Sequence, residues 1–440
     1  MSRHPGAIGL DREPAVGGER TVPSPDPIAR DYLLLALRLD ARDPGYVDAF
    51  DGPAALKAAV DIEQPPSLRR LRDDATGLAA RIGTVVADPF RHRFLTDQVA
   101  AMGLRAAILD GVTMPYLDEV EGLYGIRPSA RPVAVFDAAG AALDALLPGR
   151  GAIDVRLAAW DDGLTIPIDR LPAIVDGLTD ALRAIAREAI GLPDLESVRV
   201  GLVTGQPWSG YNWYDGGGHS RIDLNVDLPI RAPELLDVLA HETYAGHHLE
   251  HAWKEALLVE AAGHLEASVQ TLLTPECLIS EGLADLGPGL LLSDDARTEL
   301  LAGILRQAGL AGSDVASRST ASIATAMRPH RRRLAEVAVN AAIARWSEGA
   351  SSEAVLADLR GLGRQSDERA RKRLEFIEHP RWRTYVHVYY EGEPLLRRWV
   401  DAAPGGDRLA RFGRLVREPL TPAGIAAELA TEVDAGTGRP

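Results

Sequence analysis

Four of the eleven histidines of this 440-residue chain lie within eleven positions of one another, beside a glutamate. They are His241, His247, His248 and His251, and Glu242 follows the first of them. Imidazole nitrogens and carboxylate oxygens are common zinc ligands in proteins. The segment therefore predicts one zinc ion per chain and chemistry on a water molecule activated beside it.

The spacing departs from that of a simple metal-binding helix. The run from His241 begins like the H-E-x-x-H signature of zinc peptidases, but position 245 is alanine. On a straight helix His247 would lie about 240° around the axis from His241, and His248 about 10.5 Å further along it. Gly246 can break the helix and restore the pairing of His241 with His247. We therefore expect His247 as the second ligand and His248 as its alternative.

A third ligand is expected from the segment 279–286, because catalytic zinc takes three protein ligands and leaves a fourth position for water. Glu281 is the expected ligand. Asp285 lies four residues later on the same helical face, where it can accept the second ring proton of a ligand histidine.

A second arrangement of the metal site stays open. His247 and His251 are four residues apart, so on an unbroken helix they could form the metal pair with His241 left out. Glu250 is interpreted as a solvated helix residue.

Several segments resemble a bacterial family, the domain of unknown function family 885, whose members carry a HExxPGHH-type signature. They are the run from His241 to His248, Leu224-Asn225-Val226, Ser280-Glu281-Gly282, Tyr389-Tyr390-Glu391-Gly392 and the stretch from Arg91 to Pro128. The resemblance spans most of the chain beyond the first thirty residues. The chain departs from the family at Ala245, where the family has proline, and at Asn340, where an aspartate is expected.

The resemblance implies a fold and an active site. The family is similar to helical zinc carboxypeptidases of the Taq type. This implies a mainly α, gluzincin-like metallopeptidase body with a small β-sheet beside the active-site helix. By resemblance to the family's Y-x-x-G, Tyr389 is the expected donor to the oxyanion, with Tyr385, Tyr390 and His387 as alternatives.

These residue types indicate a hydrolase. Glu242 is expected to take a proton from water and to return it to the leaving amine. We predict a zinc-dependent hydrolase that cleaves amide bonds of short peptides or peptide-like substrates. A metal-dependent non-peptide hydrolase or lyase, and a metal-stabilised binding protein without catalysis, remain alternatives, and the sequence does not choose between exo- and endo-cleavage.

The substrate cleft is expected next to a strand at Arg221–Val226, where apolar and polar residues alternate. If this strand has a free edge that faces the cleft, it can pair with an extended peptide. Asn225 and Tyr214 are the residues expected to contact the substrate, although Tyr214 could equally be a packing residue.

Periodicity and composition supply the frame around the site. Apolar spacing predicts helices at 31–38, 68–82, 94–109 and 171–190, short strands at 133–136, 153–160 and 198–203, and a metal helix that starts at Pro233. We expect a mobile arm at 1–28, a helical N-terminal half at 29–200 and a metal-binding catalytic half at 201–440. The two halves are expected to form one continuous body.

Charge and composition exclude some partners. A net charge of −15 argues against nucleic acid, and the basic run from Arg328 to Arg333 is interpreted as a solvated helix face rather than an anion site. Cys277 is the only cysteine, so an intramolecular disulfide is impossible. The first twenty residues lack the apolar region of a secretory signal, and no apolar run approaches the about 20 residues of a membrane span. We expect a cytoplasmic protein without membrane partners, as monomer or homodimer.

Overall fold

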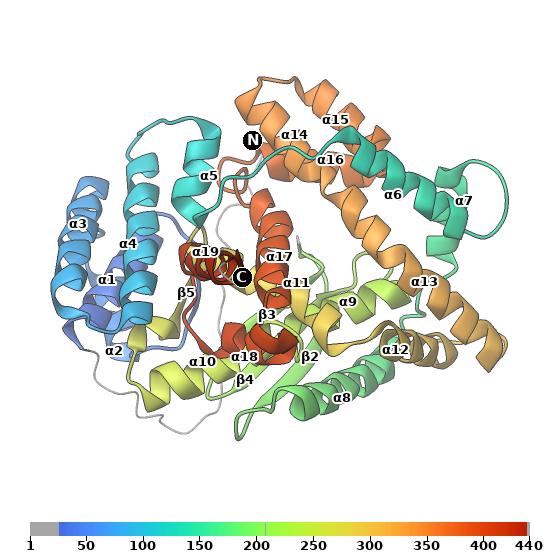
Figure 1. Ribbon diagram of the computed structural model, residues 1–440, viewed down its shortest axis with the longest axis horizontal. Coiled ribbons are helices and arrows are strands. Elements are labelled where there is room, and N and C mark those ends of the chain that lie inside the picture. The colour runs from blue at the N-terminus through green and yellow to red at the C-terminus, as the bar shows by residue number, and fades with distance from the viewer. Residues whose placement is uncertain (1–25, 207, 438–440) are drawn as a thin grey trace.

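The computed structural model describes residues 26–206 and 208–437 as a mainly α-helical molecule with two small sheets (Figure 1). The predicted fold class is confirmed. Residues 1–25 of the expected N-terminal arm lie outside the described residues. The last residues of that arm already belong to the first helix, which begins at Pro27 with the Asp26 side chain accepting from the backbone of Ile28 and Ala29.

The described elements before residue 232 are mostly helices. They are α1 (Pro27–Asp40), β1 (Val47–Phe50), α2 (Ala54–Ile62), α3 (Leu68–Val85), α4 (Pro89–Leu109), α5 (Tyr116–Tyr124), α6 (Val133–Leu146), α7 (Ile153–Asp162), α8 (Leu171–Ala189), β2 (Ser197–Val203), β3 (Gly210–Gly216) and β4 (His219–Asn225). The four helices predicted in this region are confirmed as α1, α3, α4 and α8, and the strand predicted at 198–203 is β2.

The second part of the chain begins with α9 and the histidine-rich segment 241–251. Its elements are α9 (Ala232–Glu242), α10 (His247–Lys254), the π-helix η1 (Glu255–Ala261), the 3₁₀-helix η2 (Leu265–Ser268), β5 (Val269–Thr271), α11 (Pro275–Leu291), α12 (Asp294–Gln307), α13 (Asp314–Ala335), α14 (Val337–Ser347), α15 (Ser352–Gly361), α16 (Asp367–Glu378), α17 (Val386–Asp401), the 3₁₀-turn η3 (Pro404–Gly406), α18 (Arg408–Arg417) and α19 (Pro422–Thr437). Pro233 lies in the first turn of α9, as predicted. None of the described helices combines the length and apolar composition needed to cross a lipid bilayer.

Two of the predicted strands are wrong, because both segments are helical. The segment 133–136 starts α6, whose buried residues Phe136, Ala139, Gly140 and Leu143 recur at helical spacing. The segment 153–160 forms most of α7, which packs through Ile153, Leu157 and Trp160. Short apolar runs do not distinguish a strand from a helix until the residues that follow them are considered.

The sheet beside α9 and α10 has the order β2-β4-β3. β4 pairs with β2 in parallel and with β3 antiparallel, with Ile222 opposite both Val200 and Asn212. The strand predicted to offer a free edge is therefore central, and β3 is an outer strand. Gly217 and Gly218, both with positive φ, form the β3–β4 turn, and their backbone N–H groups donate to the Glu255 carboxylate at 2.9 and 2.8 Å.

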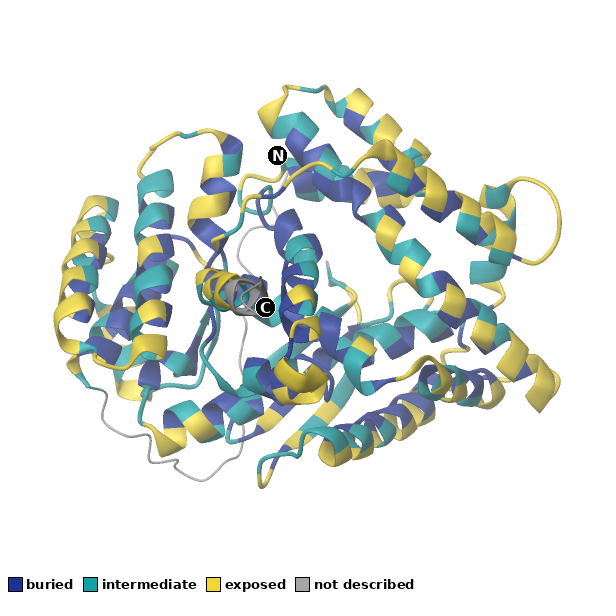
Figure 2. Ribbon diagram, in the orientation of Figure 1, coloured by how far each residue is buried: buried dark blue, intermediate teal, exposed yellow. Residues whose placement is uncertain are grey.

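Two large apolar cores run through the described part of the chain, beside a small third cluster of Leu34, Leu37 and Val60. The larger core joins α1, α3, α4 and α5 with α11, α14, α17 and α18, and the smaller core joins α8, β4 and α9 with α12 and α13. Buried positions are therefore concentrated in central helices such as α17, whereas peripheral α7 has no fully buried residue (Figure 2). Residues on both sides of position 200 contribute to each core.

Helices α11 and α17 cross where two glycines face each other. A Cβ on Gly282 would lie 2.6 Å from the carbonyl carbon of Gly392. A Cβ on Gly392 would lie 2.5 Å from the backbone oxygen of Leu278. The two backbones can approach this closely only because neither residue has a side chain. The contact fixes α11, which carries the expected third ligand, against α17, which carries Tyr389.

Alanine at either glycine of this crossing is expected to destabilise the protein. The added methyl group must push two helix backbones apart, an overpacking cost of about 1–3 kcal/mol. Gly177→Ala is the matched control, because Gly177 is exposed within α8 and an added Cβ meets nothing within 4 Å; it should stabilise by up to about 1 kcal/mol. Urea unfolding checks this, and equal midpoints for Gly282→Ala and Gly177→Ala would contradict the role of the crossing.

Candidate metal centre

A break between α9 and α10 shapes the centre. α9 ends at Glu242 and α10 begins at His247, and Thr243 and Gly246 between them have non-helical backbone angles. A Cβ on Gly246 would lie 1.9 Å from the backbone oxygen of His241, so only glycine fits there. The break brings the His241 and His247 rings to a centroid separation of 4.7 Å, nearly perpendicular to each other.

Three side chains converge at this break. One ligand atom from each of His241, His247 and Glu281 lies within 4.8 Å of the others. The Glu281 Oε2 atom is 3.4 Å from His241 Nε2 and 3.9 Å from His247 Nε2. Tetrahedral zinc with bonds of about 2.1 Å separates its ligand atoms by about 3.4 Å, so small side-chain movements would complete the geometry.

The Glu281 carboxylate provides a test of whether these residues fit a cation. Its Oε2 atom is buried and has no hydrogen-bond partner among the described residues. A buried carboxylate oxygen without a donor is costly. A cation held between Oε2 and the two histidine Nε2 atoms would remove that cost. The donor set and the unpartnered oxygen thus fit zinc.

Asp285 orients the first histidine. Its carboxylate lies 3.2 Å from His241 Nδ1 and accepts from Arg332 Nη2 at 3.0 Å. Burial alone would raise the pKa of Asp285, but the Arg332 charge and the bond to His241 hold it at about 2. An ionised carboxylate can only accept, so Asp285 keeps a proton on His241 Nδ1, and Nε2 is the ring nitrogen that faces Glu281.

A buried chain of hydrogen bonds orients the second histidine. His247 Nδ1 lies 3.1 Å from Ser280 Oγ, and the Ser280 hydroxyl donates to Glu250 at 2.6 Å. Glu250 also accepts from Lys254 at 2.7 Å and is 1% exposed. Although burial raises the pKa of Glu250, Lys254 and its other neighbours bring it below the ordinary value. The interpretation of Glu250 as a solvated residue is therefore wrong.

Tyr385 holds the third expected ligand. Its hydroxyl donates to Glu281 Oε1 at 3.1 Å and accepts from the buried Cys277 thiol at 3.2 Å. This leaves Glu281 Oε2 directed at the histidines. Tyr385, an alternative for the oxyanion donor, is thus already bonded to Glu281. His387, another alternative, is buried and lies 3.0 Å from the Tyr116 hydroxyl.

Glu242 lies next to the three converging residues and lines a cavity of about 770 Å³ together with His241. Burial raises the pKa of Glu242, although the two nearby histidines oppose the increase. Its backbone oxygen accepts from Asn212 Nδ2 at 2.7 Å, which ties β3 to the end of α9. Gly210, also on β3, lies over the side chain, because a Cβ there would be 3.6 Å from Glu242 Cγ.

Tyr389 and Tyr390 line the same cavity. Burial and the carboxylate of Glu281 raise the pKa of Tyr389 well above its ordinary value, so its hydroxyl stays protonated and can donate. Tyr389 therefore lines the same cavity as Glu242, and its role as donor to the oxyanion stays a prediction.

The structure does not bring three of the expected site residues to the cavity. His248 points to the sheet, where its ring lies 2.9 Å from Ser220 Oγ and 3.3 Å from Glu196 Oε2. The Tyr214 hydroxyl donates to Glu255 at 2.5 Å, on the face of β3 that packs against the helices. Asn225, at the end of β4, donates to the backbone oxygen of Gln206 between β2 and β3 and accepts from the backbone N–H of Asp227. None of the three lines the cavity in the part of the chain that the structure describes.

His251 also stays outside the converging group. Its ring stacks on His247 at 5.8 Å, and Gln270 Nε2 lies 2.7 Å from its Nδ1. Burial lowers the pKa of His251 to about 3, so it is neutral. It supports the His247 ring by packing.

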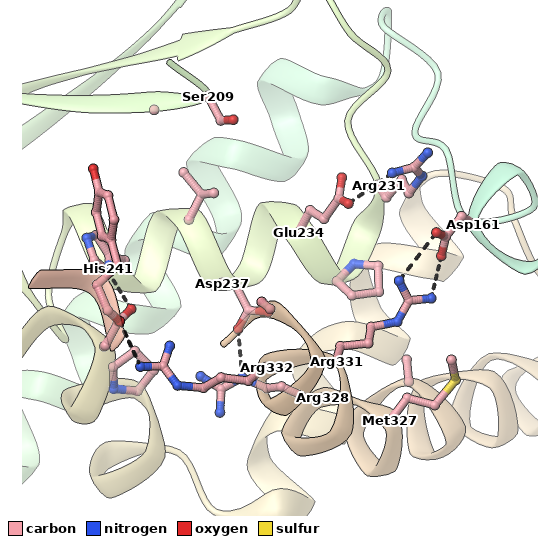
Figure 3. A pocket seen from close by; sticks show the side chains of 18 of the residues that line it. Asp161, Ser209, Arg231, Glu234, Asp237, His241, Met327, Arg328, Arg331 and Arg332 are labelled. Carbon is pink, nitrogen blue, oxygen red and sulfur yellow. Dashed lines mark hydrogen bonds and ion pairs between the residues drawn. The ribbon is translucent and has the colours of Figure 1, made fainter. Parts of the chain in front are cut away.

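Two features near the centre were not found from the sequence. The Tyr211 hydroxyl donates to Asp48 of β1, and burial raises the pKa of that carboxyl to about 6. The pair is 163 positions apart in the chain, so no local pattern could have revealed it. In addition, Arg328, Arg331 and Arg332 line the cavity (Figure 3). The interpretation of this basic run as a solvated face is therefore wrong.

Metal analysis of single variants tests the centre. Wild type should carry about one zinc per chain, and His241→Ala, His247→Ala and Glu281→Ala should lose it, because three protein ligands are needed. His248→Ala and His251→Ala are the controls that should keep it. Elemental analysis of the folded proteins, checked by circular dichroism, gives the result. Zinc retained by Glu281→Ala and lost by His251→Ala would contradict this ligand set.

The hydrogen-bond chain behind His247 is expected to matter for affinity. Ser280→Ala removes the acceptor of His247 Nδ1 and should weaken zinc binding about 10–100-fold. Ser209→Ala, which changes a cavity serine that bonds none of the three converging residues, is the control. Competition with a chromogenic chelator measures both constants. Equal affinities would mean that Ser280 does not orient the ring.

Known proteins that resemble this chain share its fold, and they give no information on its chemistry. No family model and no curated protein matches the chain. Among solved structures it is similar to "the putative lipoprotein from Colwellia psychrerythraea", with a TM-score of 0.50 and 13% identity over 86% of this chain and 65% of that one. A "putative lipoprotein of unknown function from Shewanella oneidensis" has a TM-score of 0.43 and 12% identity over 92% and 73% of the two chains. The chain thus spans about two thirds of the first protein, and that likeness shows the fold alone.

Proposed function

We propose that this protein is a zinc-dependent hydrolase that cleaves amide bonds of short peptides or peptide-like substrates. The observation that carries the proposal is the convergence of His241, His247 and Glu281 around a buried, unpartnered carboxylate oxygen. Each of the three is oriented from behind by a separate hydrogen bond. Such support is typical of a metal centre rather than of an ordinary polar core.

The chemistry follows from what the surrounding residues can do. Zinc bound by the three side chains would polarise a substrate carbonyl and lower the pKa of a water molecule toward about 7. Glu242, whose pKa is raised by burial, can take a proton from water and pass it to the leaving amine. Tyr389 keeps its proton and can donate to the oxygen that becomes negative. The outer strand β3 lies over Glu242 and replaces β4 as the strand that could pair with an extended peptide.

The alternatives differ in what they require of Glu242. A metal-stabilised binding protein needs closed coordination and has no use for a free carboxylate beside the ion. Glu242 lines an open cavity beside the centre, which favours catalysis. A non-peptide hydrolase or lyase shares the metal chemistry, and only a substrate panel separates it from a peptidase.

Family membership, oligomeric state and location are also proposals. We retain the resemblance to the domain of unknown function family 885 and the cytoplasmic location as predictions, with monomer and homodimer both open. The structural neighbour with a TM-score of 0.50 is itself described as a putative lipoprotein. Fractionation of cells that express the full chain tests the cytoplasmic location directly.

Glu242→Gln separates catalysis from metal binding. The variant should keep about one zinc per chain and lose at least about 100-fold in turnover, because it removes a general base. Glu188→Gln, at an exposed position of α8, is the matched control. Mass spectrometry of dipeptides to pentapeptides with free and blocked termini measures cleavage. Zinc without any turnover in wild type would favour the binding protein, and wild-type turnover in Glu242→Gln would exclude its role as base.

A further inference from the structure

The cavity that contains the metal centre has a wall rich in arginine. Seven arginines and five carboxylates line it, although the whole chain has a net charge of −15. Figure 3 shows Arg328, Arg331 and Arg332 on the α13 side of the cavity, opposite Asp237 on α9, with His241 toward one end. The local excess of positive charge is therefore concentrated where a substrate would lie.

Pairing within the wall does not cancel this excess. Asp237 accepts from Arg297 and also from Arg328 Nε at 2.9 Å, so two cations share one carboxylate. Arg297 is 5% exposed, and its Nη1 atom has no partner among the described residues. The group therefore keeps one positive charge, and Arg328, the more exposed of the two arginines, faces the cavity.

A second carboxylate, one turn nearer the start of α9, is also shared by two arginines. Glu234 accepts from Arg231 at 2.9 Å and from Arg369 at 3.1 Å. Beside it on α16, Arg373 has no carboxylate within 4.0 Å in the part of the chain that the structure describes. Its guanidinium carbon lies 6.0 Å from the centre of the Tyr390 ring, and both side chains line the cavity.

We propose that this arginine wall, through Arg373 and Arg328, binds a carboxylate of the substrate, so that the enzyme prefers peptides with an acidic side chain near the scissile bond. The inference rests on the proposed hydrolase function, whose substrate class it specifies. A planar guanidinium matches a carboxylate with two parallel hydrogen bonds. In a partly enclosed cavity their attraction is screened less than at an exposed surface.

Matched peptides test the preference. Tetrapeptide pairs differ only by Glu or Gln, at each position in turn, with identical termini. For zinc-loaded wild type, kcat/KM should be about 10-fold or more higher for the Glu member at a position next to the cleaved bond. In Arg373→Gln this ratio should fall toward one, and in Arg373→Lys, which keeps the charge, part of it should return. Arg371→Gln, on the exposed side of the same helix, should leave the ratio unchanged.

A binding measurement separates the two proposals. Calorimetry should show N-acetylglutamate binding at least about 10-fold more tightly than N-acetylglutamine to zinc-loaded wild type, with the difference lost in Arg373→Gln. If no peptide is cleaved but this difference is found, the hydrolase proposal fails and the acidic-ligand site stands. Equal binding of the two compounds, or equal cleavage of Glu and Gln peptides, overturns the arginine-wall proposal.

Discussion

The contact between Gly246 and the backbone oxygen of His241 is the constraint on which the convergence of His241, His247 and Glu281 depends. An unbroken helix would turn His247 away from His241. The break brings His247 back beside His241. For this, the backbone at Gly246 must approach the last turn of α9 so closely that a Cβ on Gly246 would lie 1.9 Å from the backbone oxygen of His241. Gly287 on α11 is needed for the same reason, because a Cβ there would lie 1.8 Å from the backbone oxygen of Ala245.

Helix α11 organises the centre from the other side. Within one and a half turns it carries Ser280, Glu281 and Asp285, which bond His247, Tyr385 and His241 respectively. Glu281 and the two residues that orient the histidines, Ser280 and Asp285, are therefore held together on one helix. The glycine crossing with α17 then sets the position of that helix against Tyr385, which fixes the rotation of Glu281.

Much of this arrangement could be predicted from the sequence, because the relevant signals are local. Gly246, between His241 and the pair His247-His248, indicated the helix break, and the i, i+4 spacing of Glu281 and Asp285 placed both on one face. The role of Glu250 could not be predicted, because its partner Ser280 is 30 positions away in the chain. From the local sequence a charged glutamate is expected to face solvent, whereas in the structure the Glu250 carboxylate is buried and paired with Lys254. Which strand forms the edge of the sheet could not be predicted either. The alternation in β4 indicates a half-buried strand but does not show whether it pairs on one side or on both.

The basic run on α13 shows a similar limit. A cluster of arginines on a helix is usually solvated, and only the tertiary structure shows that α9 and α7 offer Asp237 and Asp161 to it. Asn340, noted as a departure from the family pattern, has a structural role: its side chain bonds both the backbone N–H and the backbone oxygen of Arg131, each at 2.7 Å.

The contact between Tyr211 and Asp48 has a consequence for the folding of the chain during its synthesis. Asp48 lies on the strand after the first helix, whereas Tyr385, which orients Glu281, lies just before α17. Contacts between distant parts of a chain form only after long loops have closed. During synthesis, therefore, no emerging segment contains a finished centre. The surroundings of His241, His247 and Glu281 are a property of the completed chain, and a nascent polypeptide cannot bring the three side chains together as the folded protein does.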